Sequence, residues 1–526
     1  MKLKFYKLLL CCCLVSSLLL CSSCNNSAPS EKQVVVDIMN YENVNLLDYG
    51  AKADASEDIA QAVAKAAPLL GEHQALYFPN GTYAVNEDLV IDAPVKLSGN
   101  VSIVVAEGKT LTINGLFGAA IQNIFGGKGS VRITNDRVWG YMEWFEADED
   151  DTTAKFQKAV DSLRCMYLPA GTYRISEVYL NSPTSIKAIG ERRVAVQAEA
   201  GVEHLFNIQS NDVSFEGLNC SMKNAPEAIC FYFNTAEKDI SGVNILACEV
   251  SEAITGLTDA NASHTASNVT LDSVDFTNAR GTSIHMRDFS GNINLIRVAI
   301  HRRQFNNPVY NMGVPGAIFE NADGMFLKHF DVNGEANVVN GPQKDWIEQN
   351  IGGHGCVFRN CSNVKMVRAL MEYFAGSGFV IENCTKFEWE NVFCYTFHGY
   401  GFDINGLTDS KFIMMKSMVN GGDTDRSEEN IRWRNCSDIY VSSMITNVSR
   451  SKAVTFENCS DMQMDSVACF EKFNKNSIGV YDAGGNSNIV IESLTDSGTQ
   501  TDSGTIADYA FVSTGNGITV KKLLAR

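Results

Sequence analysis

The chain has little proline and, after residue 23, no apolar stretch long enough to cross a bilayer. Its 526 residues include 10 proline and 41 glycine residues, which excludes a proline-rich linker and fits a fold with many tight turns. Hydrophobic residues make up 45% of the chain, enough to form a buried core, so the sequence is not that of a disordered protein.

Positive charge is also scarce. The chain has 43 Lys and Arg residues against 61 Asp and Glu residues, a formal net charge of -18. The first 23 residues hold three of the lysines and no acidic residue, so the rest of the chain is more acidic still. A surface of this charge repels a phosphate backbone, and we therefore expect no nucleic-acid partner.

The N-terminus has the pattern of an export signal. Three lysines precede an apolar run from Leu8 to Leu20, which is too short for a comfortable membrane span. The following Cys21-Ser22-Ser23-Cys24 resembles a bacterial lipobox with Cys24 as the lipidated residue. We predict a lipoprotein signal peptide over residues 1–23 and a tether over 24–43. The protein would be anchored to the bacterial cell envelope, at the outer membrane or cell surface. The alternative is an ordinary signal peptide that contains cysteines.

Eleven of the 16 cysteines lie beyond residue 24, and four of them recur in one motif. In this motif an aromatic or aliphatic residue is followed by a charged residue, then by Asn and then by Cys. Its asparagines are separated by 23, 52 and 23 residues: Asn360, Asn383, Asn435 and Asn458. One weaker step, in which Leu407 takes the cysteine position, falls within the longer interval. Cysteines that recur once in each repeat do not form the close groups that bind a metal, so we predict no metal site.

The repeat consists of short segments in which apolar and polar residues alternate, which is typical of strands with one buried face. No segment between them is long enough for a crossover helix, which excludes a βαβ array. We therefore predict an all-β fold, a single-stranded parallel β-helix. Asn would adopt a left-handed conformation at each bend, and the cysteines would stack inside as small hydrophobic residues.

The front half contains one pattern twice. Residues 47–54 precede a predicted helix from Ser56, as N-cap, to Leu70, and then a strand with a Pro-Asn-Gly turn. About 90 residues later a second predicted helix, Thr153 to Leu163, leads to a similar strand. We predict an N-terminal cap with a small β-rich module over residues 44–140. The β-helix, with a second cap-like element, follows over residues 141–526.

The segments Leu47-Asp48-Tyr49-Gly50-Ala51-Lys52 and Tyr77-Phe78-Pro79-Asn80-Gly81-Thr82-Tyr83, with a helix between them, resemble the N-terminal cap of a known superfamily. This is the pectate-lyase-like superfamily of right-handed parallel β-helix proteins. It includes polygalacturonases, pectate and alginate lyases, other polysaccharide hydrolases and phage tailspikes. The resemblance covers most of residues 44–526 at the level of fold. It implies a right-handed solenoid with a cap helix and a polysaccharide as partner, and it does not specify the reaction.

Register within the repeat brings two carboxylates together. One outward column of the Asn-Cys strand contains Glu382, and the column two residues earlier contains Asp403 one coil further on. Adjacent coils are about 4.8 Å apart, so the two side chains would be diagonal neighbours. A pair of carboxylates is what glycoside hydrolysis requires, and we therefore predict these two as catalytic residues. A charge-compensated outer surface is the alternative interpretation of the same columns.

Other polar and aromatic residues surround this pair in the same register. Three arginines are predicted to bind acidic sugar groups: Arg359, Arg432 and Arg434. His354 stacks in register with Ser377 and Tyr400, each 23 residues apart, and could line a groove with Tyr400. Trp346, in a long insertion, could pack against a sugar face or pin its loop to the body.

The sequence thus favours a membrane-anchored, carbohydrate-active enzyme, most simply a glycoside hydrolase that acts on a polysaccharide. Such acid–base chemistry needs no cofactor. One alternative is a polysaccharide lyase that uses Arg or Lys, together with Ca²⁺. Another is a non-catalytic glycan-binding or adhesin-like β-helix at the cell surface.

Overall fold

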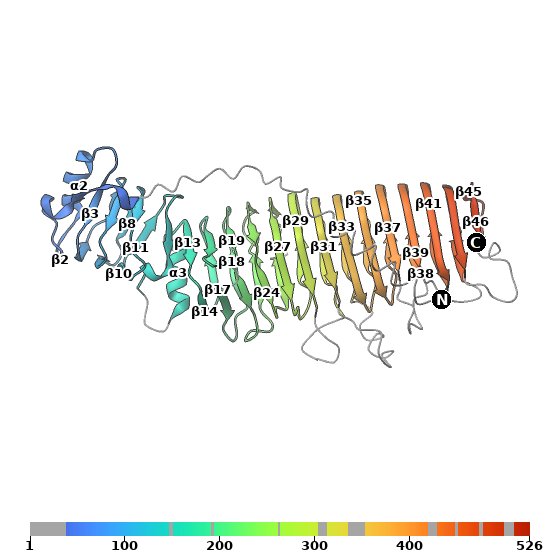
Figure 1. Ribbon diagram of the computed structural model, residues 1–526, viewed down its shortest axis with the longest axis horizontal. Helices are drawn as coiled ribbons and strands as arrows, with labels where there is room; N and C mark the ends of the chain where they lie inside the picture. Colours follow the sequence, from blue (N-terminus) through green and yellow to red (C-terminus); the bar gives the residue numbers. More distant parts are fainter. Residues whose placement is uncertain are drawn as a thin grey trace, which may run out of the picture.

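The computed structural model describes most of the chain beyond the N-terminal segment. The described residues are 38–146, 151–190, 194–260, 263–302, 313–334, 353–418, 429–447, 451–472, 477–498 and 510–525. The molecule is an elongated solenoid, with the N-terminal module at one end and the last strands at the other (Figure 1). The predicted all-β parallel β-helix is confirmed.

Helices are few and short in the described residues. Two are α-helical, α2 (Ala60–Ala66) and α3 (Thr152–Ser162), and four are single 3₁₀ turns, η1 (Ile38–Asn40), η2 (Leu46–Tyr49), η3 (Ala67–Leu69) and η4 (Met142–Trp144). None of the helices in the described part of the chain is both long and apolar enough to cross a membrane.

The N-terminal module is itself a short stack of parallel strands arranged in three sheets. Its strands are β1 (Glu42–Asn45), β2 (Asp54–Asp58), β3 (Gln74–Phe78), β4 (Gly81–Val85), β5 (Leu89–Ile91), β6 (Val95–Leu97), β7 (Val101–Val105), β8 (Thr110–Ile113), β9 (Phe117–Gly118), β10 (Phe125–Gly127) and β11 (Ser130–Ile133). Parallel bridges from Phe125 to Phe145 and from Ile133 to Leu163 continue this stack into the main solenoid.

Two long parallel sheets form the main solenoid. The 13-stranded sheet contains β15 (Val178–Leu180), β18 (His204–Ile208), β21 (Ile229–Phe233), β25 (Thr255–Asp259), β28 (Ile284–Arg287), β30 (Ala317–Glu320), β32 (Cys356–Arg359), β34 (Phe379–Glu382), β36 (Phe402–Asn405), β38 (Glu429–Arg434), β40 (Lys452–Glu457), β42 (Ile478–Asp482) and β44 (Phe511–Ser513).

The 22-stranded sheet begins with short strands and continues with long ones. The short ones are β12 (Trp139–Tyr141), β13 (Cys165–Leu168), β14 (Gly171–Ile175), β16 (Ser185–Ala188), β17 (Val194–Ala198), β19 (Ser214–Glu216), β20 (Asn219–Ser221), β22 (Ile240–Ser241), β23 (Asn244–Leu246), β24 (Glu249–Ser251) and β26 (Ala266–Ser267). The later ones are β27 (Thr270–Thr277), β29 (Phe289–His301), β31 (Asp323–Asn333), β33 (Ser362–Phe374), β35 (Thr385–Phe397), β37 (Thr408–Met418), β39 (Ser437–Asn447), β41 (Ser460–Lys472), β43 (Ser487–Gly498), β45 (Ile518–Val520) and β46 (Leu523–Ala525).

Each coil of the C-terminal half follows the predicted plan. A four- to six-residue strand of the smaller sheet ends at an Asn with positive φ, such as Asn360 at 52° or Asn383 at 54°. Gly406, at 72°, takes this place in the weaker step of the repeat. Asn is tolerated there because its short polar side chain can hydrogen-bond locally. The amide of Asn360 donates to Asn321 Oδ1 at 3.1 Å, which links neighbouring bends.

The interior of the described coils is mainly apolar. Inward columns stack aromatic and aliphatic residues that are fully buried, such as Phe358, Ile381 and Trp433. The eleven cysteines beyond residue 24 are all buried and unbridged, as predicted, and Cys361 and Cys384 stack on adjacent coils. The core therefore relies on packing between coils rather than on covalent links.

The first predicted helix begins later than expected. Ser56 lies in strand β2, and α2 is preceded by Ile59, which makes no capping side-chain hydrogen bond. The prediction of Ser56 as N-cap is therefore wrong. Asp58 Oδ1 instead accepts from the Ala60 N–H at 2.6 Å, and Asp58 Oδ2 also binds the Asn86 N–H, so this carboxylate joins β2 to the helix start.

The second predicted helix is confirmed as α3. Its N-cap is Asp151, whose Oδ1 accepts from the Ala154 N–H at 2.9 Å. The helix contacts β11 of the N-terminal module as well as β14 and β15 of the solenoid. It lies between the module and the solenoid rather than over an open end (Figure 1).

Candidate functional site

The outward columns predicted around Glu382 are present. Six successive strands of the smaller sheet pair in parallel: β30, β32, β34, β36, β38 and β40. One residue of each strand is paired with the equivalent residue of the next strand, and these residues form the first column: Glu320, Arg359, Glu382, Asn405, Arg434 and Glu457. In the second column Val380 pairs with Asp403, and Asp403 pairs with Arg432. Glu382 and Asp403 are therefore diagonal neighbours on adjacent strands, as the repeat spacing indicates.

Arginines bind both of these carboxylates directly. Arg359 lies between two acids, with Nε 2.7 Å from Glu382 Oε2 and one terminal nitrogen 2.9 Å from Glu320 Oε1. Asp403 accepts from Arg432 through both oxygens, at 3.1 and 2.9 Å, and from Arg434 at 3.2 Å. The arginine cluster, as we call it, consists of three arginines and the three carboxylates that they bind: Arg359, Arg432, Arg434, Glu320, Glu382 and Asp403. Its ion pairs occupy both oxygens of Asp403 and one oxygen of Glu382.

His354 and Tyr400 lie beside the arginine cluster, in the turns before β32 and β36. The Ser377 N–H donates to His354 Nδ1 at 2.9 Å, and the Tyr400 N–H donates to Ser377 Oγ at 3.1 Å. Because Nδ1 accepts, the neutral ring carries its proton on Nε2. Burial lowers the pKa of His354, although Asp403 opposes this shift. The guanidinium of Arg432 lies 4.0 Å above the Tyr400 ring.

Two predicted residues lie outside the described part of the chain. These are Trp346, predicted to contact a sugar, and Cys24, predicted to be lipidated. The catalytic and binding roles of the arginine cluster stay predictions.

The structure reveals a second carboxylate pair that the sequence reasoning missed. It lies at the C-terminal ends of β31 and β33, on the outer face of the larger sheet. Asn333 pairs with Glu372, and Asp331 pairs with Leu370, so Asp331 and Glu372 are diagonal neighbours. His301, at the end of β29, pairs with Asn333. We call Asp331, Glu372, His301 and Asn333, with Arg368 and His329 beside them, the acid cluster.

Contacts within the acid cluster leave one carboxylate oxygen unsatisfied. Asn333 Nδ2 donates to Glu372 Oε2 at 3.3 Å. By contrast, Asp331 Oδ1 is buried and has no hydrogen-bond partner among the described residues. A buried polar atom without a partner calls for an explanation, and a catalytic role is one of the explanations known for such atoms.

Both acids of this pair are shifted toward the protonated form. Burial raises the pKa of Asp331, while Arg368 and His329 oppose the shift. Burial also raises the pKa of Glu372, and the nearby Asp331 adds to the rise. Burial lowers the pKa of His329, with a further contribution from Arg368. Shifts of this kind in one cluster are characteristic of acid–base sites.

The acid cluster also lies next to the longest insertions in the sequence. His301 and Asn333 are the last residues of β29 and β31, and in the sequence 15 and 22 residues, respectively, separate these strands from β30 and β32. Loops that project from a rigid solenoid are where such folds carry binding groups. Among the described residues, no group of three or more His, Cys, Asp or Glu side chains is placed to hold a metal ion.

Comparison with known proteins bears on the N-terminal part of the chain. Residues 43–140 match the family model described as rhamnogalacturonase A/epimerase, pectate lyase-like. A search of curated proteins found no significant match.

Solved structures with a similar fold include three carbohydrate-related or surface proteins. The A-module of the Azotobacter vinelandii mannuronan C-5 epimerase AlgE6 is 11% identical, with 92% of this chain and 99% of that chain covered and a TM-score of 0.30. PfbA, a surface adhesin of Streptococcus pneumoniae, is 12% identical, with 92% of this chain and 93% of that chain covered and a TM-score of 0.27.

The catalytic domain of a GH87 alpha-1,3-glucanase is 10% identical, with 72% of this chain and 67% of that chain covered and a TM-score of 0.32. At these TM-scores the likenesses say nothing about activity. Residues 43–140 are therefore similar to the rhamnogalacturonase A/epimerase, pectate lyase-like family model, and the chain as a whole has parallel β-helix architecture.

Proposed function

We propose that the protein is a membrane-anchored glycoside hydrolase that cleaves a polysaccharide, with Asp331 and Glu372 as its acid–base pair. The observation that supports this most is the placement of two half-buried carboxylates in diagonal register on an outer sheet face, with Asp331 two residues before a 22-residue interval between strands. The family match over residues 43–140 is consistent with a carbohydrate substrate. Anchoring through Cys24 is proposed from the sequence.

The surroundings of the two acids suggest different roles. Glu372 has burial and a neighbouring carboxylate acting together on its pKa, which favours a protonated group that can donate to the glycosidic oxygen. Asp331 has the guanidinium of Arg368 nearby, and this positive charge favours its ionised form. An ionised Asp331 would activate water or attack the sugar carbon, as the second carboxylate does in glycosidases.

The arginine cluster then has a supporting role in this proposal. Its guanidinium groups are already paired with Glu320, Glu382 and Asp403. An acidic polysaccharide could exchange with these carboxylates for bidentate bonds to arginine. The competing hypothesis, in which Glu382 and Asp403 are the catalytic pair, is tested by the same experiment.

The decisive experiment is a polysaccharide panel that includes pectic and alginate polymers. New reducing ends and the ultraviolet absorbance of unsaturated uronides would be followed together. We expect reducing ends without absorbance. Glu372→Gln and Asp331→Asn should each lower kcat by about 100-fold or more, because each removes a proton-transfer or nucleophilic group. Glu390→Gln, at a half-exposed carboxylate of β35 outside both clusters, is the matched control.

The variants of the two clusters separate the hypotheses. Full activity in both Glu372→Gln and Asp331→Asn would reject the acid cluster. Loss of turnover confined to Glu382→Gln and Asp403→Asn would move the catalytic site to the arginine cluster. Retained glycan binding without turnover on any substrate would favour a non-catalytic surface protein.

A polysaccharide lyase is the second candidate, and one feature favours it. His329 adopts a left-handed backbone conformation, with φ of 55°, and its neutral imidazole lies near Arg368. A neutral imidazole can take the proton next to a uronate carboxyl while an arginine binds that carboxyl. Product absorbance that disappears in His329→Ala would show elimination rather than hydrolysis.

A further inference from the structure

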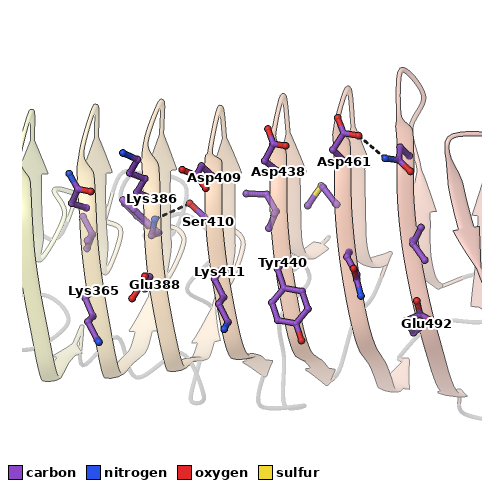
Figure 2. Close-up of a pocket in the computed structure, with 18 of the residues that line it drawn as sticks. Lys365, Lys386, Glu388, Asp409, Ser410, Lys411, Asp438, Tyr440, Asp461 and Glu492 are labelled. Atoms are coloured by element: carbon purple, nitrogen blue, oxygen red, sulfur yellow. Dashed lines mark hydrogen bonds between the residues drawn. The ribbon is translucent and has the colours of Figure 1, made fainter.

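A groove of about 920 Å³ lies on the outer face of the larger sheet, apart from both clusters. It crosses the N-terminal parts of β33, β35, β37, β39, β41 and β43 (Figure 2). The acid cluster occupies the opposite, C-terminal ends of β31 and β33. We call this hollow the strand-crossing groove. Its volume is within the range of known ligand sites.

Two rows of polar side chains line the strand-crossing groove, one residue from each coil. The upper row in Figure 2 comes from bend positions with positive φ and contains Lys386, Asp409, Asp438 and Asp461. The lower row comes from paired strand positions and contains Lys365, Glu388, Lys411, Tyr440 and Gln463. Because each step equals one strand spacing, about 4.8 Å, the rows form a repeating template along the solenoid axis.

The charges of the lining argue against a charged polymer as ligand. Four lysines and five acidic residues line the groove, and cations and anions are interspersed. Nucleic acids and highly charged polyanions bind surfaces with a clear excess of positive charge. The near balance of charges here favours a ligand without net charge.

The floor of the groove argues against an extended peptide. Peptides that add to a sheet require an unpaired strand edge. The floor strands β35, β37, β39 and β41 are each paired on both sides, and the groove runs across them. A ligand in it must therefore be recognised by side chains alone.

Side chains of the lower row suit a hydroxyl-rich chain. Lys365 and Lys411 donate hydrogen bonds, Glu388 accepts them, and Gln463 does both, which matches hydroxyl groups that donate and accept. The half-exposed ring of Tyr440 lies beside Lys411, whose Nζ is 5.7 Å from the ring centroid. A tyrosine ring offers an apolar face on which a sugar ring can pack.

We propose that the strand-crossing groove is a second, non-catalytic site that binds a neutral polysaccharide chain lying along the solenoid axis. The site goes beyond the proposed hydrolase activity and does not require it. It would hold a wall or matrix glycan while the acid cluster acts elsewhere on the same molecule.

Affinity electrophoresis and titration calorimetry on the full chain test this proposal. The probes are galactomannan, mixed-linkage β-glucan and pullulan, with polygalacturonate as an acidic comparison. We expect at least one neutral probe to bind. Tyr440→Ala should weaken that binding by about 10-fold, since it removes the ring contact. Tyr440→Phe should keep most of the affinity, although it loses the hydrogen bond from the hydroxyl to Asp465.

Controls distinguish this site from the catalytic one. Tyr179 on β15 is also an exposed tyrosine that donates to a carboxylate, Glu177, but it lies on the other sheet. Tyr179→Ala should bind the neutral probe like the wild type, and so should Glu372→Gln. Absence of binding to all three neutral probes would overturn the proposal. Equal affinity in Tyr440→Ala and the wild type would do the same.

Discussion

The carboxyl group of Asp331 lies where its charge is disfavoured. Burial raises its pKa, and one of its oxygens has no partner among the described residues. When the folded-state pKa of an acid is raised, the folded protein binds the proton more tightly than the unfolded chain. Stability from this group is therefore present at low pH and is lost as pH rises through the folded pKa.

This sign gives a prediction for Asp331→Asn, which replaces the acid by a neutral group of the same shape. We expect the variant to melt at a higher temperature than the wild type at pH 7, because it avoids burying a charge. The difference should shrink at pH 4, because a larger fraction of the wild-type carboxyl is protonated there than at pH 7. Melting curves at both pH values provide the measurement. This account would be contradicted if the melting temperature of Asp331→Asn, measured relative to the wild type, were lower at pH 7 than at pH 4.

The sequence predicted the arginine cluster but not the acid cluster, and the reason lies in individual residues. The Asn-Cys motif aligns every strand that carries residues such as Arg359 and Glu382, so their facing can be counted. Asp331 lies beyond irregularities in the pairing of β31 with β33 around Lys328. Counting from the motif through such a bulge does not tell which face a side chain takes. Polar residues two apart before an insertion, Asp331 and Asn333, were the available signal.

At the scale of the element, the asparagine bends determine where each strand ends. Asn360 has a φ of 52° and donates its amide to Asn321 of the preceding coil. We predict that Asn360→Ala lowers the free energy of unfolding by about 1–2 kcal/mol, the typical cost of a left-handed conformation for a residue with a Cβ. Asn360→Gly should cost less, because Gly adopts this conformation without strain.

Chemical denaturation of the two variants would check this prediction. Asn391→Ala is the control, since Asn391 is an exposed asparagine inside strand β35 without positive φ. An equal effect of Ala and Gly at position 360 would show that the amide contact, rather than backbone strain, dominates. The bends were predictable because an asparagine side chain is visible in the sequence. The start of α2 was not, because the side chain that binds its first N–H belongs to Asp58, the last residue of strand β2, and not to Ser56.

At the scale of the whole molecule, the N-terminal module and the solenoid share one continuous core. Trp144 lies at their junction, where it packs on Phe117 with ring centroids 5.1 Å apart. Its indole N–H donates to the Ala120 carbonyl at 2.9 Å. In a solenoid each unit is stabilised mainly by its neighbours, so the junction decides whether the two parts unfold together.

We predict that Trp144→Ala costs about 3–5 kcal/mol and separates unfolding into two calorimetric transitions. Trp139→Ala is the matched control, because Trp139 is half-exposed and stacks on Tyr167 at the surface. A single transition at the wild-type temperature in Trp144→Ala would show that the junction does not couple the two parts.

The buried cysteines have a consequence for how this molecule can be observed. Eleven thiols are distributed from Cys165 to Cys469, and each is enclosed by the coils above and below it. A thiol that solvent cannot reach reacts with an alkylating reagent only when its own coil opens. Alkylation followed by peptide mass analysis would therefore time the opening of each part of the solenoid separately. The natural cysteines would therefore report local opening at eleven known positions along the solenoid.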